Sequence, residues 1–376
     1  MENIIFSSSL AFLITFFSIP VIIEVAKDKK LFDVPGERKV HKMVIPTLGG
    51  LGIFAGFIFA TLIGVPPTDA SVLQYFMAAI MIIFFMGIKD DILILTATKK
   101  FIGQLVAAGI VIKFGGIEIN NLYGILGVHA LPPTAAFLIT LFTIVVITNS
   151  FNLIDGVDGL AGSLGLISSL IFGLYFYYSG HTLYAIMALS LAGSLFGFLI
   201  YNFSPARIFM GDTGSLLIGL INSILVIKFI NVASDPSSAL PLTSAPALAL
   251  AILIVPLFDT LRVVGVRMIS RRSPFSPDRN HIHHFLLDMG LSHKSVALIC
   301  SGTNLLLVVM AYLLRFNGTT FVLLTLAGTS TLLVTLVIFS RPKRKIMVTK
   351  GHHLHEEPLI PTRNIFTMAG KTVEQD

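Results

Sequence analysis

The chain alternates between long apolar stretches and short polar segments over most of its length. The apolar stretches have few charges and approach the roughly 20 residues that a helix needs to cross a bilayer. Eleven of them are found, at 4–26, 47–65, 72–88, 101–117, 134–151, 160–179, 182–201, 213–232, 245–265, 295–314 and 319–340. This pattern predicts an all-α polytopic membrane protein with about 11 transmembrane helices.

The positions of the basic residues predict the orientation. Of the 26 Lys and Arg residues, 23 fall in the segments 27–46, 89–100, 202–212, 262–294 and 341–376. Cytoplasmic loops of membrane proteins carry such an excess, so we expect the N-terminus outside and the C-terminus in the cytoplasm. Residues 1–340 are then expected to form a transmembrane domain, and residues 341–376 a basic, disordered cytoplasmic tail.

Composition agrees with a lipid environment. The chain is 55% hydrophobic and 12% charged, whereas soluble domains carry about 25% charged residues. The net charge of +6 would suit nucleic acid, but the basic residues lie between apolar stretches, where they match anionic headgroups and anionic substrates. We therefore expect a membrane protein without a nucleic-acid partner. The sequence leaves open whether it forms a dimer.

Acidic residues are few, and several lie at helix ends that are predicted to face the cytoplasm. These residues are Asp90, Asp91, Asp155, Asp158, Asp212 and Asp259. A carboxylate at the membrane boundary is costly without a partner or a function, so we expect one shared site. Two members also have structural alternatives: Asp212 could cap the helix that it begins, and Asp259 could pair with Arg262.

Clustered carboxylates suit a hard cation such as Mg²⁺, which is commonly held by one or two of them together with substrate phosphates. The glycines that flank these acids would leave amides at helix starts free to bind phosphate. They are Gly156, Gly159, Gly162, Gly211 and Gly214. A secondary transporter is an alternative of another class, but it would place its charged site near the bilayer midplane. A non-catalytic scaffold would tolerate loss of the acids.

The predicted inner loop 262–294 contains four arginines before residue 273 and the run His281-Ile-His-His284. Neighbouring side chains on a helix diverge, and no cysteine is available nearby as a further ligand, so the histidines do not predict a zinc site. They suit contacts to phosphate oxygens. A solvated basic loop that follows the positive-inside rule is the structural alternative.

Several stretches, in this order, resemble the polyprenyl-phosphate N-acetylhexosamine-1-phosphate transferases of glycosyltransferase family 4. They are Asp33-Val-Pro-Gly-Glu-Arg-Lys-Val-His41, Pro46-Thr-Leu-Gly-Gly50, Gly87-Ile-Lys-Asp-Asp91, Asn149-Ser-Phe-Asn-Leu-Ile-Asp-Gly-Val-Asp-Gly-Leu160, Phe209-Met-Gly-Asp-Thr-Gly-Ser215 and His281-Ile-His-His284. The histidine run resembles the WecA/TagO-like branch more than the related MraY enzymes. Thr47 departs from the family pattern, in which many members have Arg.

The resemblance implies that N-acetylglucosamine-1-phosphate, or a related sugar phosphate, passes from a UDP-sugar to undecaprenyl phosphate with release of UMP. This would be the first membrane step of a cell-envelope glycan pathway, such as lipopolysaccharide or teichoic acid synthesis, with Mg²⁺ or Mn²⁺ as cofactor. The alternative within the family is a phospho-MurNAc-pentapeptide transferase of peptidoglycan synthesis.

The resemblance also implies the roles of individual residues. Asp212, with Asp90 and Asp91, is expected to hold the metal. The catalytic residues expected are Asp90, Asp91, Asp155, Asp158, His281, His283 and His284. The substrate contacts expected are Arg38, Lys39, His41, Lys100, Asn152 and Arg279. Because a phosphate monoester has its second pKa near 6, the acceptor is mostly dianionic at neutral pH and proton removal is a small part of the task. A covalent phospho-aspartate intermediate remains an alternative to direct transfer.

Overall fold

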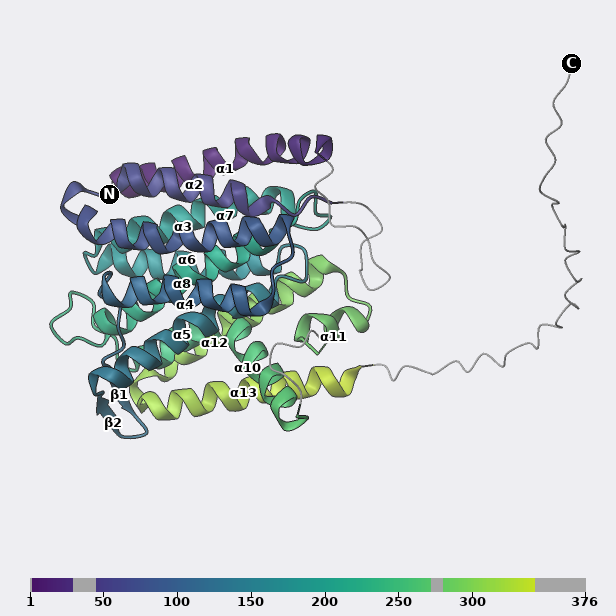
Figure 1. Ribbon diagram of the computed structural model, residues 1–376. Helices are drawn as coiled ribbons and strands as arrows, with labels where there is room; N and C mark the ends of the chain where they lie inside the picture. The colour runs from purple at the N-terminus through teal and green to yellow at the C-terminus, as the bar shows by residue number, and fades with distance from the viewer. Residues whose placement is uncertain (1, 30–44, 272–279, 342–376) are drawn as a thin grey trace, which may run out of the picture. The chain divides into compact units, whose positions relative to one another are not determined.

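The structure of the chain, a computed structural model, describes residues 2–29, 45–271 and 280–341, which are predominantly helical. The helices within these residues are α1 Glu2–Asp28, α2 Gly49–Gly64, η1 Pro67–Asp69, α3 Ala70–Ile92, α4 Ala97–Lys113, α5 Pro133–Ile154, α6 Leu160–Tyr178, α7 Thr182–Asn202, α8 Gly211–Ala233, α9 Ala245–Ile252, α10 Ile254–Ile269, α11 Ile282–Asp288, α12 His293–Leu314, η2 Arg315–Asn317 and α13 Thr319–Ser340. Figure 1 shows the long helices packed roughly side by side. The predicted tail lies, apart from Arg341, outside the described residues.

Each of the eleven predicted apolar stretches lies largely in a helix or, for 245–265, in the pair α9–α10. Eight helices of the described part are long and apolar enough to cross a membrane, and the bent pair would be a ninth. The predicted polytopic helical protein is therefore confirmed. The helix α2 is apolar but only 16 residues long, and α4 carries three lysines within 17 residues. The count of eleven spans stays a prediction.

The largest departure from the predicted helices is the break between α9 and α10, where the two axes differ by 82°. Pro256 lies in the first turn of α10, lacks an amide donor, and in a continuous helix would clash with the carbonyl of Ile252. The side chain of Asn304 in α12 satisfies the groups freed by the break. Its amide donates to the Ile252 carbonyl (3.0 Å), and its Oδ1 accepts from the amide of Val255 (3.3 Å).

The helices α7 and α8 form the buried centre of the helical unit, whereas α1 and α13 lie at its edges (Figure 1). Large side chains such as Phe172 and Phe198 are fully buried in the centre. The edge helices expose large apolar side chains, including Phe17 of α1 and Leu324 of α13. Exposing so much apolar surface to water is unfavourable, so these faces are suited to contact lipid.

One short hairpin interrupts the helices and was not predicted from the sequence. Strands β1 Asn121–Ile125 and β2 Val128–Ala130 pair antiparallel between α4 and α5. Gly124 and Gly127 adopt positive φ angles of 82° and 80° around the turn, a conformation that favours glycine. Figure 1 shows the hairpin and the start of α1 at one end of the helical unit, with α11 and the end of α13 at the other.

Candidate functional site

Glycines allow the ends of α2, α3 and α8 to meet closely. A Cβ on Gly50 of α2 would lie 2.3 Å from the backbone nitrogen of Gly214, and a Cβ on Gly87 of α3 would lie 2.5 Å from the Cα of Thr213. The amide of Gly50 also donates to the carbonyl of Met210 (2.9 Å). Any larger residue at Gly50 or Gly87 would separate these backbones. The motif glycines therefore first serve the packing that brings the acidic helix ends together.

Asp91, at the end of α3, caps the start of α8. Its Oδ1 accepts from the amide of Asp212 (2.7 Å), and its Oδ2 accepts from the amide and the hydroxyl of Thr213 (3.1 and 2.5 Å). A carboxylate at this position accepts hydrogen bonds from amides that have no partner within the helix. Its negative charge also interacts favourably with the positive end of the helix dipole. At Asp212 and Thr213 the expectation of free amides was therefore wrong. Asp212 does not cap α8, because the residue before the helix is Met210 and the Asp212 carboxylate lies instead against Lys100 and Asn152.

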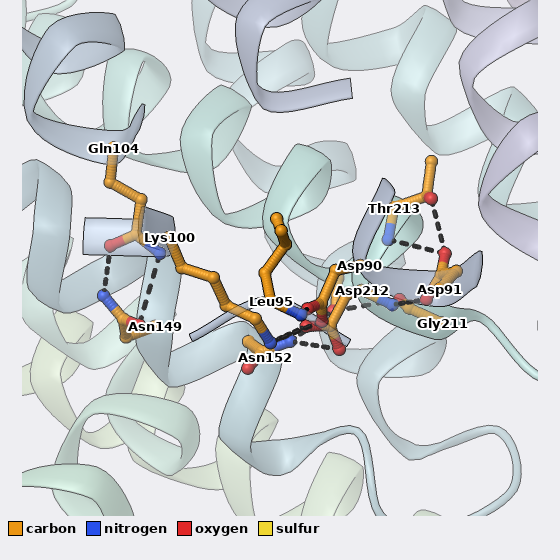
Figure 2. Close-up of polar contacts among 11 residues, drawn as sticks. Asp90, Asp91, Leu95, Lys100, Gln104, Asn149, Asn152, Gly211, Asp212 and Thr213 are labelled. Atoms are coloured by element: carbon orange, nitrogen blue, oxygen red, sulfur yellow. Dashed lines mark hydrogen bonds and ion pairs between the residues drawn. The ribbon is translucent and has the colours of Figure 1, made fainter. Parts of the chain in front are cut away.

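Lys100 joins the carboxylates of α3 and α8. Its Nζ lies 2.5 Å from Oδ2 of Asp90 and 2.5 Å from Oδ2 of Asp212 (Figure 2). Asp90 also accepts a hydrogen bond from the amide of Leu95 on its other oxygen (2.7 Å). Two carboxylates with one ammonium between them form a cation-binding arrangement that keeps a net negative charge. The predicted substrate contact Lys100 thus lies at the centre of the predicted metal site.

Amides from α5 complete this arrangement. The Nδ2 of Asn152 donates to Oδ1 of Asp212 and to the hydroxyl oxygen of Ser215, both at 3.0 Å. One turn earlier, Asn149 exchanges two hydrogen bonds with Gln104 of α4, at 2.6 and 3.3 Å (Figure 2). This pair ties α4 to α5 and so fixes the helix that carries Lys100. We define Asp90, Asp91, Asp155 and Asp212 together with Lys100 as the carboxylate cluster.

Asp155 follows the last residue of α5 and belongs to the same cluster. Desolvation raises the pKa of its carboxyl to about 8, and the negative charges of Asp212, Asp91 and Asp158 raise it further in the same direction. Such an influence requires the acids to lie near one another. The structure therefore brings together predicted acids from α3, α8 and the segment after α5, which are far apart in the sequence.

Asp158 is buried and anchors the turn between α5 and α6. Its Oδ2 accepts from the amide of Ala206 (3.3 Å), and its Oδ1 lies 3.3 Å from Nδ1 of His293 at the start of α12. The amide of Asp158 also donates to that ring nitrogen (3.3 Å). These contacts connect the turn to two other parts of the chain. The predicted catalytic role of Asp158 stays a prediction.

Asp259 of α10 has partners on both carboxylate oxygens. Its Oδ1 accepts from Nη2 of Arg262 (2.8 Å) and from the amide of Ile282 (3.0 Å), and its Oδ2 lies 2.8 Å from Nδ1 of His281. The predicted pairing of Asp259 with Arg262 is confirmed. We call the group formed by Asp259, Arg262, His281 and the Ile282 amide the histidine anchor. It fixes the start of α11.

The histidine run lies against the turn that follows α5. His281 and His283 are buried and stack with ring centroids 5.6 Å apart and planes 8° apart. A Cβ on Gly156 would lie 2.6 Å from Nε2 of His283, so only glycine leaves room for this ring. Burial lowers the pKa of His283 to about 3, with the charge on His284 acting in the same direction. His283 is therefore neutral at physiological pH and can accept or donate a hydrogen bond.

The structure does not describe every predicted site residue. Arg38, Lys39 and His41 fall in 30–44, and Arg279 falls in 272–279, so all four lie outside the described residues. Other residues of the site were not singled out from the sequence. Gln104 and His293 are examples, and neither has a local sequence signal because each acts through a partner on a distant helix.

Comparison with known proteins identifies relatives over most of the chain. The family described as Glycosyl transferase family 4 matches residues 73–230. The chain is 36% identical over 315 residues to the decaprenyl-phosphate N-acetylglucosaminephosphotransferase of Mycobacterium leprae, covering 77% of this chain and 78% of that protein. It is 34% identical over 302 residues to the probable undecaprenyl-phosphate N-acetylglucosaminyl 1-phosphate transferase of Bacillus subtilis, covering 79% and 80%.

A more distant relative comes from Escherichia coli. The chain is 29% identical over 300 residues to its undecaprenyl-phosphate alpha-N-acetylglucosaminyl 1-phosphate transferase, covering 78% of this chain and 79% of that protein. All three alignments cover similar shares of both chains. The similarity therefore extends well beyond the acidic helix ends.

Proposed function

Because the chain belongs to the polyprenyl-phosphate N-acetylhexosamine-1-phosphate transferases of glycosyl transferase family 4, we propose that it transfers N-acetylglucosamine-1-phosphate from UDP-N-acetylglucosamine to undecaprenyl phosphate or a similar polyprenyl phosphate, and releases UMP. The names of the three relatives contain N-acetylglucosamine, which favours this donor over a MurNAc-pentapeptide. The observation that carries the proposal is the meeting of Asp90 and Asp212 at the ammonium of Lys100.

The carboxylate cluster fits a divalent metal ion. Asp90 and Asp212 already direct an oxygen each at one cationic group. Among the described residues, no three His, Cys, Asp or Glu side chains form a metal cage by themselves, but Mg²⁺ commonly takes one or two carboxylates and fills its other positions with water and substrate phosphates. We propose that Asp90 and Asp212 hold Mg²⁺, or Mn²⁺. When bound, the ion would neutralise charge on the donor diphosphate.

The reaction joins two anions, and the protein's own residues reduce their repulsion. An oxygen of the acceptor phosphate forms a bond to the β-phosphorus of the donor while the bond from that phosphorus to the UMP oxygen breaks. Lys100 lies 2.5 Å from both metal-binding carboxylates, so its ammonium can contact phosphate oxygens that approach them. Asn152 orients Asp212. Asp91 holds the backbone amide of Asp212. It therefore acts as a positioning residue for the Asp212 carboxylate.

The turn after α5 and the histidine run form the neighbouring side of the proposed site. Gly156, which follows Asp155, lies beside the ring of His283 and is exposed. We propose that the His281–His284 segment contacts the donor through His284, which is partly exposed. We also propose four substrate contacts outside the described residues, because phosphate and uridine need cationic and hydrogen-bonding partners. They are Arg38, Lys39, His41 and Arg279.

The proposed location is the cytoplasmic face of a bacterial inner membrane. A polyprenyl chain stays in the hydrocarbon while its phosphate lies at the headgroup level, which matches acids placed at helix ends. Reporter fusions after Lys100 and after Pro236 are expected to lie on opposite sides of the membrane, with Lys100 inside. Two fusions on the same side would contradict this topology.

The activity is tested with the purified full chain in Mg²⁺. We expect UMP release from UDP-N-acetylglucosamine only when polyprenyl phosphate is present, and a lipid-linked product of equal amount. Parallel reactions with other UDP-sugars establish the donor. Intact UDP-N-acetylglucosamine in the complete mixture would contradict the enzyme, whereas turnover of only another UDP-sugar would correct the donor alone. A transporter would move substrate without releasing UMP.

A further inference from the structure

We propose that Asp259 is a positioning residue that fixes which nitrogen of His281 carries the proton and how its ring is oriented. Through His281 it also holds His283 against the turn that contains Asp155. This inference rests on the proposed transfer reaction, because it assigns Asp259 a part in that reaction. In this proposal Asp259 acts through His281 and does not itself touch the reacting phosphates.

The donors around Asp259 determine which nitrogen of His281 is protonated. The amide of Ile282 and the guanidinium of Arg262 are donors only, and both point at Oδ1 of Asp259, at 3.0 and 2.8 Å. The remaining oxygen, Oδ2, is 2.8 Å from Nδ1 of His281. An ionised carboxylate only accepts hydrogen bonds. The Nδ1 of His281 must therefore carry a proton, and its Nε2 is the nitrogen left for other contacts.

The surroundings of the Asp259 carboxylate also favour these contacts. The side chain of Asp259 is 3% exposed, and it borders an apolar cavity lined by residues of α10, α11, α12 and α13, among them Phe258, Leu286, Leu307 and Val334. A buried carboxylate in such surroundings is stable only with charged or hydrogen-bonding partners. His281 and Arg262 supply these partners. The orientation of Asp259 that makes these contacts is therefore strongly favoured over any other.

His283 links the histidine anchor to the turn that contains Asp155. The ring of His281 stacks on that of His283, with planes 8° apart. The ring of His283 in turn occupies the space beside Gly156, which follows Asp155. A rotation of His281 about its side chain would displace His283 and the turn that it contacts. Positions of reacting groups affect rates steeply, so the effect of Asp259 should appear in kcat.

The substitution D259N separates positioning from packing. Asparagine has nearly the same shape, but one oxygen becomes an NH₂ donor. The two donors from Arg262 and Ile282 would hold the remaining oxygen, so the new NH₂ would face Nδ1 of His281. That nitrogen would then have to accept, and the proton would move to Nε2. The D259N variant therefore moves the proton of His281 from Nδ1 to Nε2, while the volume of the side chain at position 259 stays nearly the same.

The experiment measures UMP release and ¹⁵N chemical shifts of histidine-labelled full-length protein, with the His281 signals identified by their loss in H281Q. We expect D259N to lower kcat by about 10²-fold with KM changed by less than about threefold. In the spectrum, the signal of a protonated nitrogen should move from Nδ1 to Nε2 of His281. The matched control is D288N, which changes an exposed aspartate on α11 that pairs with Arg341. It should leave both readouts unchanged.

A double-mutant cycle shows whether Asp259 acts through His281. The variant with both D259N and H281Q should be no more than about threefold slower than the slower single variant, because the two residues act as one unit. Effects that multiply, or full activity of D259N, would overturn the inference. If D259N does not fold, the wild-type spectrum decides, since a wild-type His281 with its proton on Nε2 would also overturn it. An inactive wild-type protein would instead contradict the proposed function.

Discussion

The carboxylate cluster, at the ends of α3, α5 and α8, and the histidine anchor, whose aspartate lies within α10, balance charge in opposite ways. In the histidine anchor, one carboxylate has three partners, and two of them, Arg262 and His281, can carry positive charge. In the carboxylate cluster, one ammonium lies between Asp90 and Asp212. Burial and nearby acids raise the pKa of Asp155 to about 8.

This difference indicates which acids have a structural task and which have a chemical one. A carboxylate whose oxygens are fully used by the protein contributes orientation, whereas carboxylates in excess of their cations attract further positive charge. Position at a helix end does not distinguish the two kinds, because Asp91, whose oxygens are both used by the protein, and Asp212 both occur there. The partners of each oxygen do, and they come from helices that are far apart in the sequence.

The largest effect is expected for D212N. Removing this charge should abolish binding of the metal and lower the rate of UMP release by about 10³-fold or more. The rise in melting temperature on adding Mg²⁺ should disappear as well, while the variant still folds. Near-normal turnover would place Asp212 with the structural acids and remove the contrast between the two regions.

The next effect is expected for K100M. Loss of the ammonium leaves Asp90 and Asp212 without the cation they share, and we expect UMP release to fall by about 10²-fold. The same change should increase the stabilisation by Mg²⁺, because Lys100 no longer competes for the carboxylates. Melting temperatures measured across a Mg²⁺ titration check this. Weaker stabilisation by Mg²⁺ in K100M would show that Lys100 assists the ion.

A smaller effect is expected for D155N on stability in the absence of metal. The folded pKa of about 8 lies above the ordinary 3.8, so the folded protein holds a proton that the unfolded chain has lost, and stability falls as pH rises between these values. Asparagine removes this dependence. In EDTA, we expect the wild-type protein and D155N to have equal melting temperatures near pH 4. At pH 8, D155N should melt about 2–6 °C higher than the wild-type protein. A constant difference across pH would contradict the raised pKa.

The smallest effect is expected for D288N. Asp288 and Arg341 form an ion pair in which both side chains are about 30% exposed, and such pairs contribute little stability. Activity should stay within about twofold and the melting temperature within about 2 °C. A large loss would mean that acids outside both regions matter, and the comparison between them would lose its meaning.

Much of the helical content could be predicted from the sequence, because long apolar stretches determine it. The shared location of Asp90, Asp155 and Asp212 could be inferred from counting helices and basic loops. The break at Leu253 could not, since it depends on Asn304 of α12 accepting and donating at the freed groups. The β1–β2 hairpin has no clear alternating pattern. The partners of Asp91 and the contact of Asp259 with His281 also lie beyond prediction, because tertiary contacts alone decide them.

The cap that Asp91 provides has a consequence for interpreting mutants. Asp212 owes its placement to a neighbour on another helix, whose oxygens hold the first peptide groups of α8. An inactive Asp91 variant therefore cannot by itself be taken as a sign that this side chain meets the reactants. A displaced neighbour would produce the same phenotype, and only a direct probe of metal affinity or of the α8 backbone separates the two causes.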